Sequence, residues 1–456
     1  MRIIVFGIGK IFHNNIHRIL KYAEIVRLTD NKAEKIGTTY MGFEVIAPDH
    51  ICDYRFDIVV ISTKKYEVEI RKQLCEMGIG ENRVISVGDF PAKMFGFKSI
   101  QVYQRLKPDK ECERKALLLS HDLSRTGAPI ALLGMAKVLN ELGFGVFVWA
   151  IGSDDALTDY LQADISVCIF DSLDLSDEMK NEMMKYDILI VNTAVLHYVI
   201  SGLPVGIPCL WWIHEEYDGY PFIPDGFVVP PNVHISGVSN RCRNSIEKHL
   251  GIECDVLPLY VEQTSENQNE KIKTDNIKRN GVIRFLTIGY GYRKGIDILL
   301  SAIEKNSEKW LDKAEFLIVG KGGEDYQIPH GVIDLGYKDQ AQIREIYSES
   351  DVVICPSRFE TLSIAVVQGW ANRKPCIVSD TVGAAEYIEQ GKNGLIFRSE
   401  NPSALSDSIQ WIIDNKSSID SMGKEAYSTY AKCFAKDTFK EKLDRLINRI
   451  LGDREL

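Results

Sequence analysis

The sequence predicts an α/β fold in which three consecutive blocks each build a mostly parallel sheet. Strand-like apolar runs alternate with helical runs along almost the whole chain, which is typical of βαβ units. The chain has 456 residues, too many for one hydrophobic core. A buried first strand that leads into a glycine or polar turn occurs three times and divides the chain into a first block (1–108), a second block (109–262) and a third block (281–435).

Composition and charge exclude several classes of protein. Hydrophobic residues make up 45% and charged residues 26%, as in ordinary soluble proteins, and the formal net charge is -10. Because nucleic-acid-binding proteins usually present a basic face, we expect no nucleic-acid partner. No apolar run approaches the roughly 20 residues that span a bilayer, and the short apolar start lacks the small residues that end a signal peptide.

The cysteines indicate a reducing compartment. All 10 are scattered singly without a CxxC pair, and Cys168, Cys209 and Cys355 lie inside apolar runs. Reduced thiols fit this pattern better than disulfides or a zinc site. We therefore expect a cytoplasmic protein.

The first block contains the skeleton of a dinucleotide-binding turn. Gly7 and Gly9 follow a predicted strand and open a predicted helix, and Asp30 ends the next strand about 20 residues later. Phe12 stands where a third glycine would let the helix approach the strand. Two interpretations stay open: a Rossmann-like domain that binds a cofactor such as NAD, and one whose glycines only turn the chain. Residues 95–114 are polar and are predicted to be a linker.

The second block places two polar motifs after buried strands. In "SHDLSRTGAP", the small residues Gly127 and Ala128 would let an anionic ligand reach the first N–H groups of a helix, unless this is an ordinary strand-to-helix loop. In "WWIHEE", His214 follows a strand directly, and ligands of open α/β sheets bind at carboxyl ends of strands. His214 could bind a hydroxyl group or take part in proton transfer, or be purely structural.

The third block follows a polar segment, 263–280, that is the clearest predicted interdomain linker. Its motif "GYGYRKG" puts Arg293 and Lys294 at the start of a helix, where a guanidinium fork and an ammonium would bind a phosphate. The alternative is a solvated basic pair. Further along, Asn401 and Pro402 are predicted to be the N-cap and first residue of a helix.

A carboxylate and, eight residues later, an amide follow another predicted strand in this block. Glu360 follows the run "DVVICPS", and the amides near Leu362 and Ser363 are predicted to be free helix N–H groups. Gln368 lies eight residues further, about 12 Å along a helix, and is expected to share a face with Glu360. That span suits a long ligand with hydroxyl groups at both ends; a capped surface helix is the alternative.

These motifs resemble a known family. The second and third blocks are similar to the retaining glycosyltransferases of family 4, which have the GT-B fold. The resemblance is carried, in order, by "SHDLSRTGAPIALL", "WWIHEE", "IGYGYRKGIDILL", "IVGKGG" and "CPSRFETLSIAVVQGWANRKPCIVSD". It implies two Rossmann-like domains around a cleft, with the acceptor on the second block and the nucleotide-sugar on the third. It also implies that a C-terminal helix, 436–456, completes the acceptor domain.

The resemblance assigns roles to individual residues. It implies that Arg293 and Lys294 grip the diphosphate, that Glu360 contacts the transferred sugar and that His214 lies beside it. Gly127 would belong to the loop that closes over the donor. The remaining predicted substrate-binding residues are Ala128, Gly320, Tyr337, Leu362, Ser363 and Gln368.

Two positions depart from the family pattern. Gln368 replaces a second glutamate, so the amide can still bond ribose hydroxyls but loses a charge-assisted acceptor. Tyr290 replaces a basic residue that often follows the glycine of the first strand. The first change keeps open a non-catalytic, binding role.

The predicted reaction transfers a sugar from a UDP- or GDP-linked donor to a saccharide or lipid-linked acceptor, in bacterial polysaccharide or glycoconjugate synthesis. No acidic pair of the DxD type occupies a suitable position, so no metal and no other cofactor is expected. Retention is expected to follow a front-face route, since no carboxylate nucleophile is well placed. Alternatives are a non-catalytic glycosyltransferase-like subunit and an NAD-dependent enzyme acting through the first block. A membrane acceptor would require only peripheral contact at the inner face of the membrane.

Overall fold

The computed structural model describes residues 2–9, 11–12, 16, 19–20, 23–63, 65–87, 90, 101–103, 112–152, 155–170, 172–173, 175–216, 223–262 and 281–452. It divides into two compact units, Met1–Ile100 with Phe170–Ser172, and Gln101–Ile169 with Leu173–Leu456. The predicted linker 263–280 lies outside the described residues, as do 95–100 and 104–111 of the other predicted linker.

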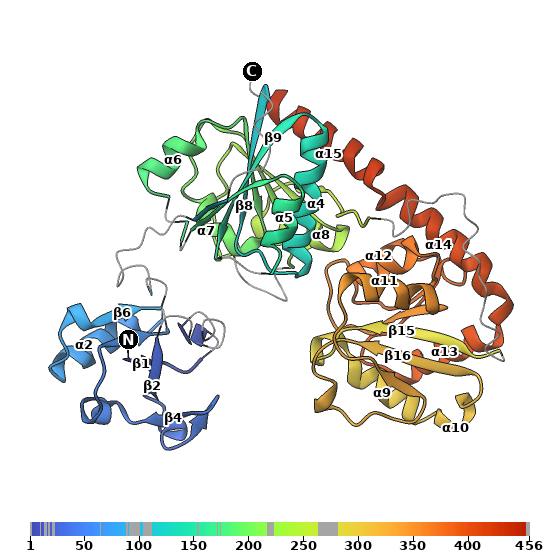
Figure 1. The fold of residues 1–456 in the computed structure, drawn as a ribbon, viewed down its shortest axis with the longest axis horizontal. Helices are drawn as coiled ribbons and strands as arrows, with labels where there is room; N and C mark the ends of the chain where they lie inside the picture. The colour runs from blue at the N-terminus through green and yellow to red at the C-terminus, as the bar shows by residue number, and fades with distance from the viewer. Residues whose placement is uncertain are drawn as a thin grey trace. The chain divides into compact units, whose positions relative to one another are not determined.

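The first block forms a six-stranded sheet in the order β3-β4-β2-β1-β5-β6 (Figure 1). Ile3 and Val5 pack into one apolar cluster, whereas Ile4 and Phe6 pack into another. Because successive side chains of a strand point to opposite faces, both faces of the sheet are buried. Its elements are β1 Arg2–Phe6, β2 Glu24–Thr29, β3 Thr39–Tyr40, β4 Phe43–Ile46, β5 Ile58–Ile61, α2 Glu67–Glu76 and β6 Val84–Ser86.

The second block forms an eight-stranded sheet in the order β14-β13-β12-β11-β8-β9-β10-β7, and the strands from β14 to β9 pair in parallel. Strand β7 lies in the stretch predicted to be a linker and pairs antiparallel with β10. The strands are β7 Gln101–Tyr103, β8 Arg114–Ser120, β9 Phe144–Ile151, β10 Ser166–Phe170, β11 Ile188–Asn192, β12 Cys209–Ile213, β13 Val233–Gly237 and β14 Asp255–Val256. The helices are α4 Gly127–Glu141, α5 Leu157–Gln162, α6 Asp177–Met183, α7 His197–Ile200 and α8 Asn240–Leu250.

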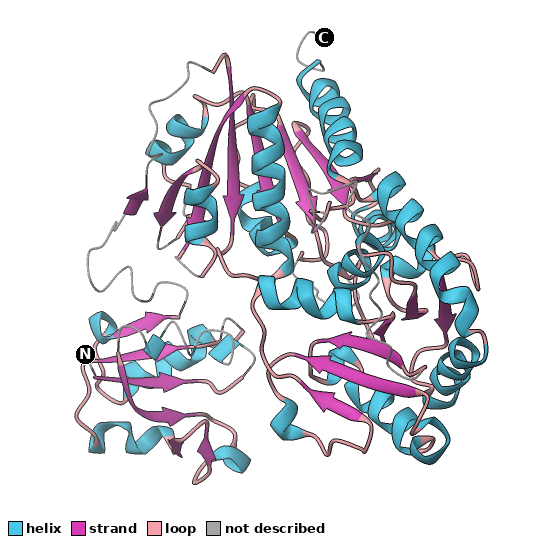
Figure 2. Ribbon diagram, turned by 45° about the vertical axis from the view of Figure 1, so that its right-hand side comes forward, coloured by secondary structure: helices cyan, strands magenta, loops and turns pink. Residues whose placement is uncertain are grey.

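The third block forms a six-stranded, all-parallel sheet in the order β17-β16-β15-β18-β19-β20 (Figure 2). The strands are β15 Ile283–Ile288, β16 Ala314–Val319, β17 Val332–Asp334, β18 Val352–Cys355, β19 Cys376–Ser379 and β20 Gly394–Phe397. The helices are α9 Ile296–Glu304, α10 Ser307–Trp310, α11 Gln340–Glu349, α12 Ile364–Ala371, α13 Pro402–Asp414 and α14 Ile419–Cys433. Short 3-10 turns include η5 Tyr292–Lys294 and η7 Gly383–Tyr387.

The last helix, α15 Lys436–Gly452, runs from the third block onto the second (Figure 1). The ammonium groups of Lys436 and Lys440 pair with Glu141 of α4. The Phe439 ring lies 6.1 Å from that of Trp212 in β12. These contacts fasten the C-terminal helix to the sheet of the second block. No described helix is long and apolar enough to cross a membrane.

Two local predictions have opposite outcomes. Asn401 caps α13, because its side chain accepts a hydrogen bond from the Ala404 amide at 3.0 Å, which confirms that prediction. The prediction that Glu360 and Gln368 share a helical face is wrong. Helix α12 begins at Ile364, and Glu360 lies before it in a single parallel bridge with Val382. That long-range bridge keeps the chain extended past the point where the sequence pattern starts the helix.

We predict that Gly295→Ala lowers the free energy of unfolding of the third block by more than the cost of an alanine in a left-handed backbone conformation. Gly295 has φ +66°, and a Cβ there would lie 2.0 Å from the carbonyl oxygen of Pro356. Gly251 has a similar φ, +69°, but open space around it. Gly251→Ala should therefore cost about 1 kcal/mol and Gly295→Ala at least about 2 kcal/mol in urea unfolding. Equal losses would contradict this packing.

Candidate functional site

The predicted basic pair and Glu360 meet at the carboxyl end of β18. Glu360 is 7% exposed, and its carbonyl oxygen accepts from the Gly383 amide at 2.8 Å. The Lys294 ammonium pairs with the Glu360 carboxylate, and Arg293 Nη1 lies 3.4 Å from the same oxygen. Since Arg293 and Lys294 form η5, just before α9, the structure brings three predicted site residues together from two strand-to-helix loops.

The electrostatics keep this carboxylate ionised. Burial alone would raise the pKa of Glu360, but the Lys294 ammonium, assisted by Ser363 and Arg293, outweighs burial and lowers it. A ligand phosphate would either share Arg293 and Lys294 with Glu360 or displace Glu360 from them. A ligand hydroxyl, by contrast, could donate directly to the carboxylate.

The free helix amides begin one or two residues later than the predicted Leu362 and Ser363. The Leu362 carbonyl accepts from the Ala384 amide at 3.0 Å, and Ser363 is the N-cap of α12 with φ +86°. The N–H groups at the start of the helix are therefore those of Ile364 and the residues that follow. A non-glycine residue at this φ is strained, which is common beside ligand sites.

The predicted base-binding region is shaped by Tyr290. A Cβ added to Gly320 would lie 3.1 Å from Tyr290 Cδ2, and one added to Gly323 would lie 3.1 Å from Tyr290 Cζ. The Tyr290 ring therefore packs in the space that Gly320 and Gly323 leave by having no side chains. A longer basic side chain at position 290 could not pack there in the same way. Tyr337 is 61% exposed at this edge, with the Lys321 ammonium 4.7 Å from its ring centre.

The start of α4 faces α12. A Cβ added to Gly127 would lie 3.4 Å from Ile364 Cδ1. Ala128 is held by Asn192, whose Nδ2 donates to the Ala128 carbonyl at 3.2 Å. A side chain longer than that of alanine at position 127 would meet Ile364, and the access of a ligand to the helix N–H groups that the motif indicates stays a prediction.

His214 lies in a polar cluster that sequence reasoning found only in part. The ends of β8, β11 and β12 bring together His121, Thr193, His214 and Glu215. The His121 Nδ1 lies 3.2 Å from Thr193 Oγ1, and Glu215 Oε2 accepts from the His214 amide at 3.1 Å. The motifs "SHDLSRTGAP" and "WWIHEE" contain His121 and Glu215, but neither residue was assigned a role. Thr193 was missed because its only sequence signal is its position immediately after a buried strand.

Burial determines the charge of this cluster. It lowers the pKa of His214 to about 3, helped by nearby His121, so the imidazole is neutral. His214 Nε2 is buried and has no hydrogen-bond partner among the described residues. Burial also raises the pKa of Glu215, although backbone N–H groups donate to it. A neutral imidazole with a free nitrogen can bond a ligand hydroxyl but is a poor acid.

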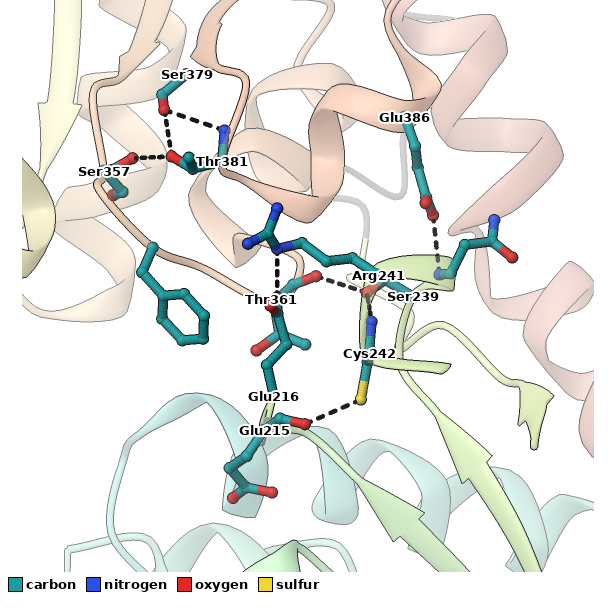
Figure 3. Close-up of polar contacts among 12 residues, drawn as sticks. Glu215, Glu216, Ser239, Arg241, Cys242, Ser357, Thr361, Ser379, Thr381 and Glu386 are labelled. Atoms are coloured by element: carbon teal, nitrogen blue, oxygen red, sulfur yellow. Dashed lines mark hydrogen bonds and ion pairs between the residues drawn. The ribbon is translucent and has the colours of Figure 1, made fainter. Parts of the chain in front are cut away.

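The N-terminus of α8 links the two blocks beside these sites (Figure 3). Ser239 Oγ donates to the Thr361 carbonyl at 2.7 Å, next to Glu360. Arg241 Nε donates to Glu216 Oε1 at 2.5 Å, and its guanidinium lies 5.9 Å from the Phe359 ring centre. Arg241 therefore connects the loop that carries His214 to the loop that carries Glu360. No sequence motif pointed to it.

The predicted dinucleotide turn is closed by the chain's own groups. The Asp30 carboxylate accepts from the Ile8 amide and from Lys35 Nζ, each at 2.8 Å. Gly7 has φ +97°, which a turn requires, and Phe12 is fully buried. A ribose at Asp30 would have to displace Lys35, so this geometry favours glycines that only turn the chain. Cofactor binding through Gly7, Gly9 and Asp30 stays a prediction.

Family models match three parts of the chain. Residues 268–429 match the model described as glycosyl transferases group 1, and residues 112–229 match glycosyl-transferase family 4. Residues 1–85 match a model described as C2185-like, N-terminal. Both blocks that form the site are therefore similar to glycosyltransferase domains.

Individual glycosyltransferases also match segments of this chain. An uncharacterized glycosyltransferase of Methanocaldococcus jannaschii is 33% identical over 132 residues, which are 27% of this chain and 32% of that protein. The D-rhamnosyltransferase WbpZ of Pseudomonas aeruginosa is 25% identical over 195 residues, covering 40% of this chain and 48% of its own. The matched segments therefore span between a third and a half of these curated relatives.

Solved structures define the fold. HepE of Anabaena, in complex with UDP and glucose, aligns with TM-score 0.61 and 16% identity over 74% of this chain and 100% of its own. Sucrose-phosphate synthase of Thermosynechococcus elongatus aligns with TM-score 0.59 and 14% identity over 75% and 100%. The second and third blocks form a GT-B pair, as predicted.

We predict that His214 makes the protein less stable in acid. Its folded pKa is about 3 and its unfolded value 6.5, so between these values the unfolded chain binds more protons and stability falls with falling pH. His214→Gln should reduce this slope by up to about 1.4 kcal/mol per pH unit. Urea unfolding from pH 7 to 4.5 measures it. His330→Gln, at an exposed position, is the control; equal slopes in all three proteins would contradict the prediction.

We predict that Arg241→Met destabilises the protein because it leaves the Glu216 carboxylate without its ion-pair partner. Glu216 is 4% exposed, while the Arg241 side chain is 36% exposed, so we expect about 2 kcal/mol, less than for a fully buried pair. Adding Glu216→Gln should recover part of the loss in urea unfolding. A double variant as unstable as the sum of both single variants would show that the pair is not coupled.

Proposed function

We propose that the chain is a retaining glycosyltransferase that moves a sugar from a nucleoside diphosphate sugar to an acceptor hydroxyl. One observation carries the proposal: Arg293, Lys294 and the ionised Glu360 meet at the carboxyl edge of β18, within the segment that matches glycosyl transferases group 1. The two cations suit the anionic diphosphate of such a donor, and the carboxylate suits the hydroxyl groups of its sugar.

Each group has a separate role in this proposal. Arg293, Lys294 and the first N–H groups of α12 offset the charge that grows on the departing diphosphate. Glu360 accepts hydrogen bonds from hydroxyls of the transferred sugar, and Gly127 leaves room for the donor at the start of α4. His214, neutral and with Nε2 unpaired, binds a further hydroxyl of the sugar. Gly320 and Tyr337 would lie along the base.

The proposed chemistry is a front-face substitution without a metal. The bond between the anomeric carbon and the diphosphate oxygen breaks, and a bond from the acceptor oxygen forms on the same face. The acceptor proton passes to an oxygen of the leaving diphosphate. Glu360 is ion-paired with Lys294, which makes its carboxylate a poor covalent nucleophile.

Relatives suggest the substrate class. HepE was solved with UDP-glucose, and the matched proteins include a D-rhamnosyltransferase and a putative teichuronic acid biosynthesis glycosyltransferase of Bacillus subtilis. We therefore propose a UDP- or GDP-linked donor and a saccharide or lipid-linked acceptor of bacterial polysaccharide synthesis, reached in the cytoplasm or at the inner face of the membrane. A non-catalytic, sugar-binding role is the second candidate, because Gln368 replaces a carboxylate of the family pattern.

We predict that product mass spectrometry with a panel of nucleotide-sugars and saccharide acceptors detects transfer. Lys294→Met and Glu360→Gln should each lower kcat by about 100-fold or more, because each removes a charge at the reacting groups. Lys392→Met is the control, since Lys392 pairs with Glu389 on the surface of the same block.

Two outcomes would decide against the proposal. Unchanged transfer by Lys294→Met and Glu360→Gln would overturn this site. Absence of transfer by both the wild type and Gln368→Glu, with nucleotide-sugar binding retained, would instead support the non-catalytic role. A fluorescence titration with NADH tests the first block independently of either result.

A further inference from the structure

The hydroxyl group of Ser239 forms one hydrogen bond in each of the two blocks that build the site (Figure 3). Its oxygen accepts from the Cys242 amide at 3.1 Å, which caps α8, and its proton is donated to the Thr361 carbonyl at 2.7 Å. A serine hydroxyl has a single proton, and this distance is the usual one for an O–H···O bond. Because Ser239 is fully buried, both bonds are shielded from water. The start of α8 is therefore fastened to the peptide that follows Glu360.

The carbonyl groups on either side of Thr361 are held by the third block itself. The Gly383 amide donates to the Glu360 carbonyl at 2.8 Å, and the Ala384 amide donates to the Leu362 carbonyl at 3.0 Å. The carbonyl between them, that of Thr361, is held from the second block instead. The segment that carries the buried carboxylate thus depends on both blocks for its backbone hydrogen bonds.

Close packing surrounds the bond between the blocks. A Cβ added to Gly383 would lie 1.8 Å from the Thr361 oxygen and 3.2 Å from Ser239 Oγ, so a side chain there would disrupt it. The next residue, Asn240, donates its amide to Glu386 Oε1 at 3.3 Å, and a carboxylate is favourable at a helix N-terminus. Consecutive residues at the start of α8 therefore contact the third block.

The segment held in this way leads into a strained residue. Ser363 has φ +86°, a conformation that a non-glycine residue keeps only when its surroundings impose it. Loss of the bond to Thr361 should let the segment relax and move the Glu360 carboxylate relative to Lys294. Arg293 and Lys294 lie on a different loop, η5, and should keep their positions.

We infer that Ser239 is a positioning residue, which holds the peptide after Glu360 from the second block so that this carboxylate stays in place for the transferred sugar. This inference rests on the proposed function. Ser239 touches no substrate and acts through Thr361. The carboxylate is in place only while the two blocks are in contact at α8, whereas the cations that bind the diphosphate are not subject to this condition.

Ser239→Gly in the full chain tests the inference, because glycine at an N-cap costs a helix little stability. The variant should lower kcat for sugar transfer about tenfold, since a contact to the reacting sugar is misplaced. Its affinity for UDP or GDP in calorimetric titration should stay within about twofold of the wild type, because the basic pair is untouched.

Hydrogen exchange without any nucleotide tests the positioning directly. In Ser239→Gly, the amides of Gly383 and Ala384 should exchange about fivefold faster, because their acceptor segment is looser. Mass spectrometry of the peptides that contain these amides measures the rates. The matched control is Ser176→Gly: Ser176 caps α6 of the same block by accepting from the Met179 amide at 3.3 Å, and its loss should change neither these rates nor kcat.

The outcomes separate this inference from the proposed function. Unchanged exchange of the two amides in Ser239→Gly overturns the inference alone, because the proposed function does not require the Ser239 bond. A fall in kcat that is matched by an equal loss of nucleotide-binding sites shows partial unfolding rather than positioning, and also overturns it. A wild type that transfers no sugar contradicts the proposed function instead, whatever the exchange rates are.

Discussion

The ion pair between Lys294 and Glu360 is the constraint on which the rest of the site depends. A buried carboxylate is costly unless a positive group compensates it, and here the compensation comes from a different strand-to-helix loop. The two loops must therefore keep their separation. Arg358 helps, since its amide donates to the Arg293 carbonyl at 2.9 Å, its guanidinium lies 3.8 Å from the Tyr292 ring centre, and Asp297 pairs with it at 2.6 Å.

This arrangement makes ligand binding an exchange of partners. Glu360 balances one of the two positive charges of Lys294 and Arg293, so under the proposed function an incoming diphosphate would compete with this carboxylate and also meet the remaining charge. The released carboxylate is then available to sugar hydroxyls that lie beside the phosphate. Under the proposed function, charge compensation in the free protein would prepare both halves of the donor site, and a ligand with only one of the two chemical features would gain less from it.

The sequence predicted the parts of this site that depend on local pattern. Apolar runs ending in polar residues correctly located β8, β12, β15 and β18, and Asn401 was recognised as a cap because its partner, Ala404, is three residues away. The start of α12 was misplaced because it depends on the bridge between Glu360 and Val382, and nothing in the local pattern encodes a pairing 22 residues distant.

Residues that act across blocks were invisible for the same reason. Arg241 lies on a helix that the pattern did not single out, and it matters because Glu216 and Phe359, far apart in sequence, lie beside it. Within the second block, His121 similarly contacts Thr193, which follows another strand of the sheet. A one-dimensional pattern reports which strand ends are polar, but only the sheet order decides which of those ends are neighbours.

The two departures from the family pattern balance each other electrostatically. Tyr290 stands where a basic residue is common, and Gln368 stands where the pattern has an acid, so one positive and one negative charge are lost together. Relative to the family pattern, the net charge contributed by these two positions is therefore unchanged. Each neutral side chain also has a structural partner: Tyr290 packs against Gly320 and Gly323, and Gln368 lies against the Tyr347 hydroxyl. This site thus concentrates its cationic charge in Arg293 and Lys294, of which Glu360 balances one, and the proposed function would leave recognition of the nucleoside to neutral groups.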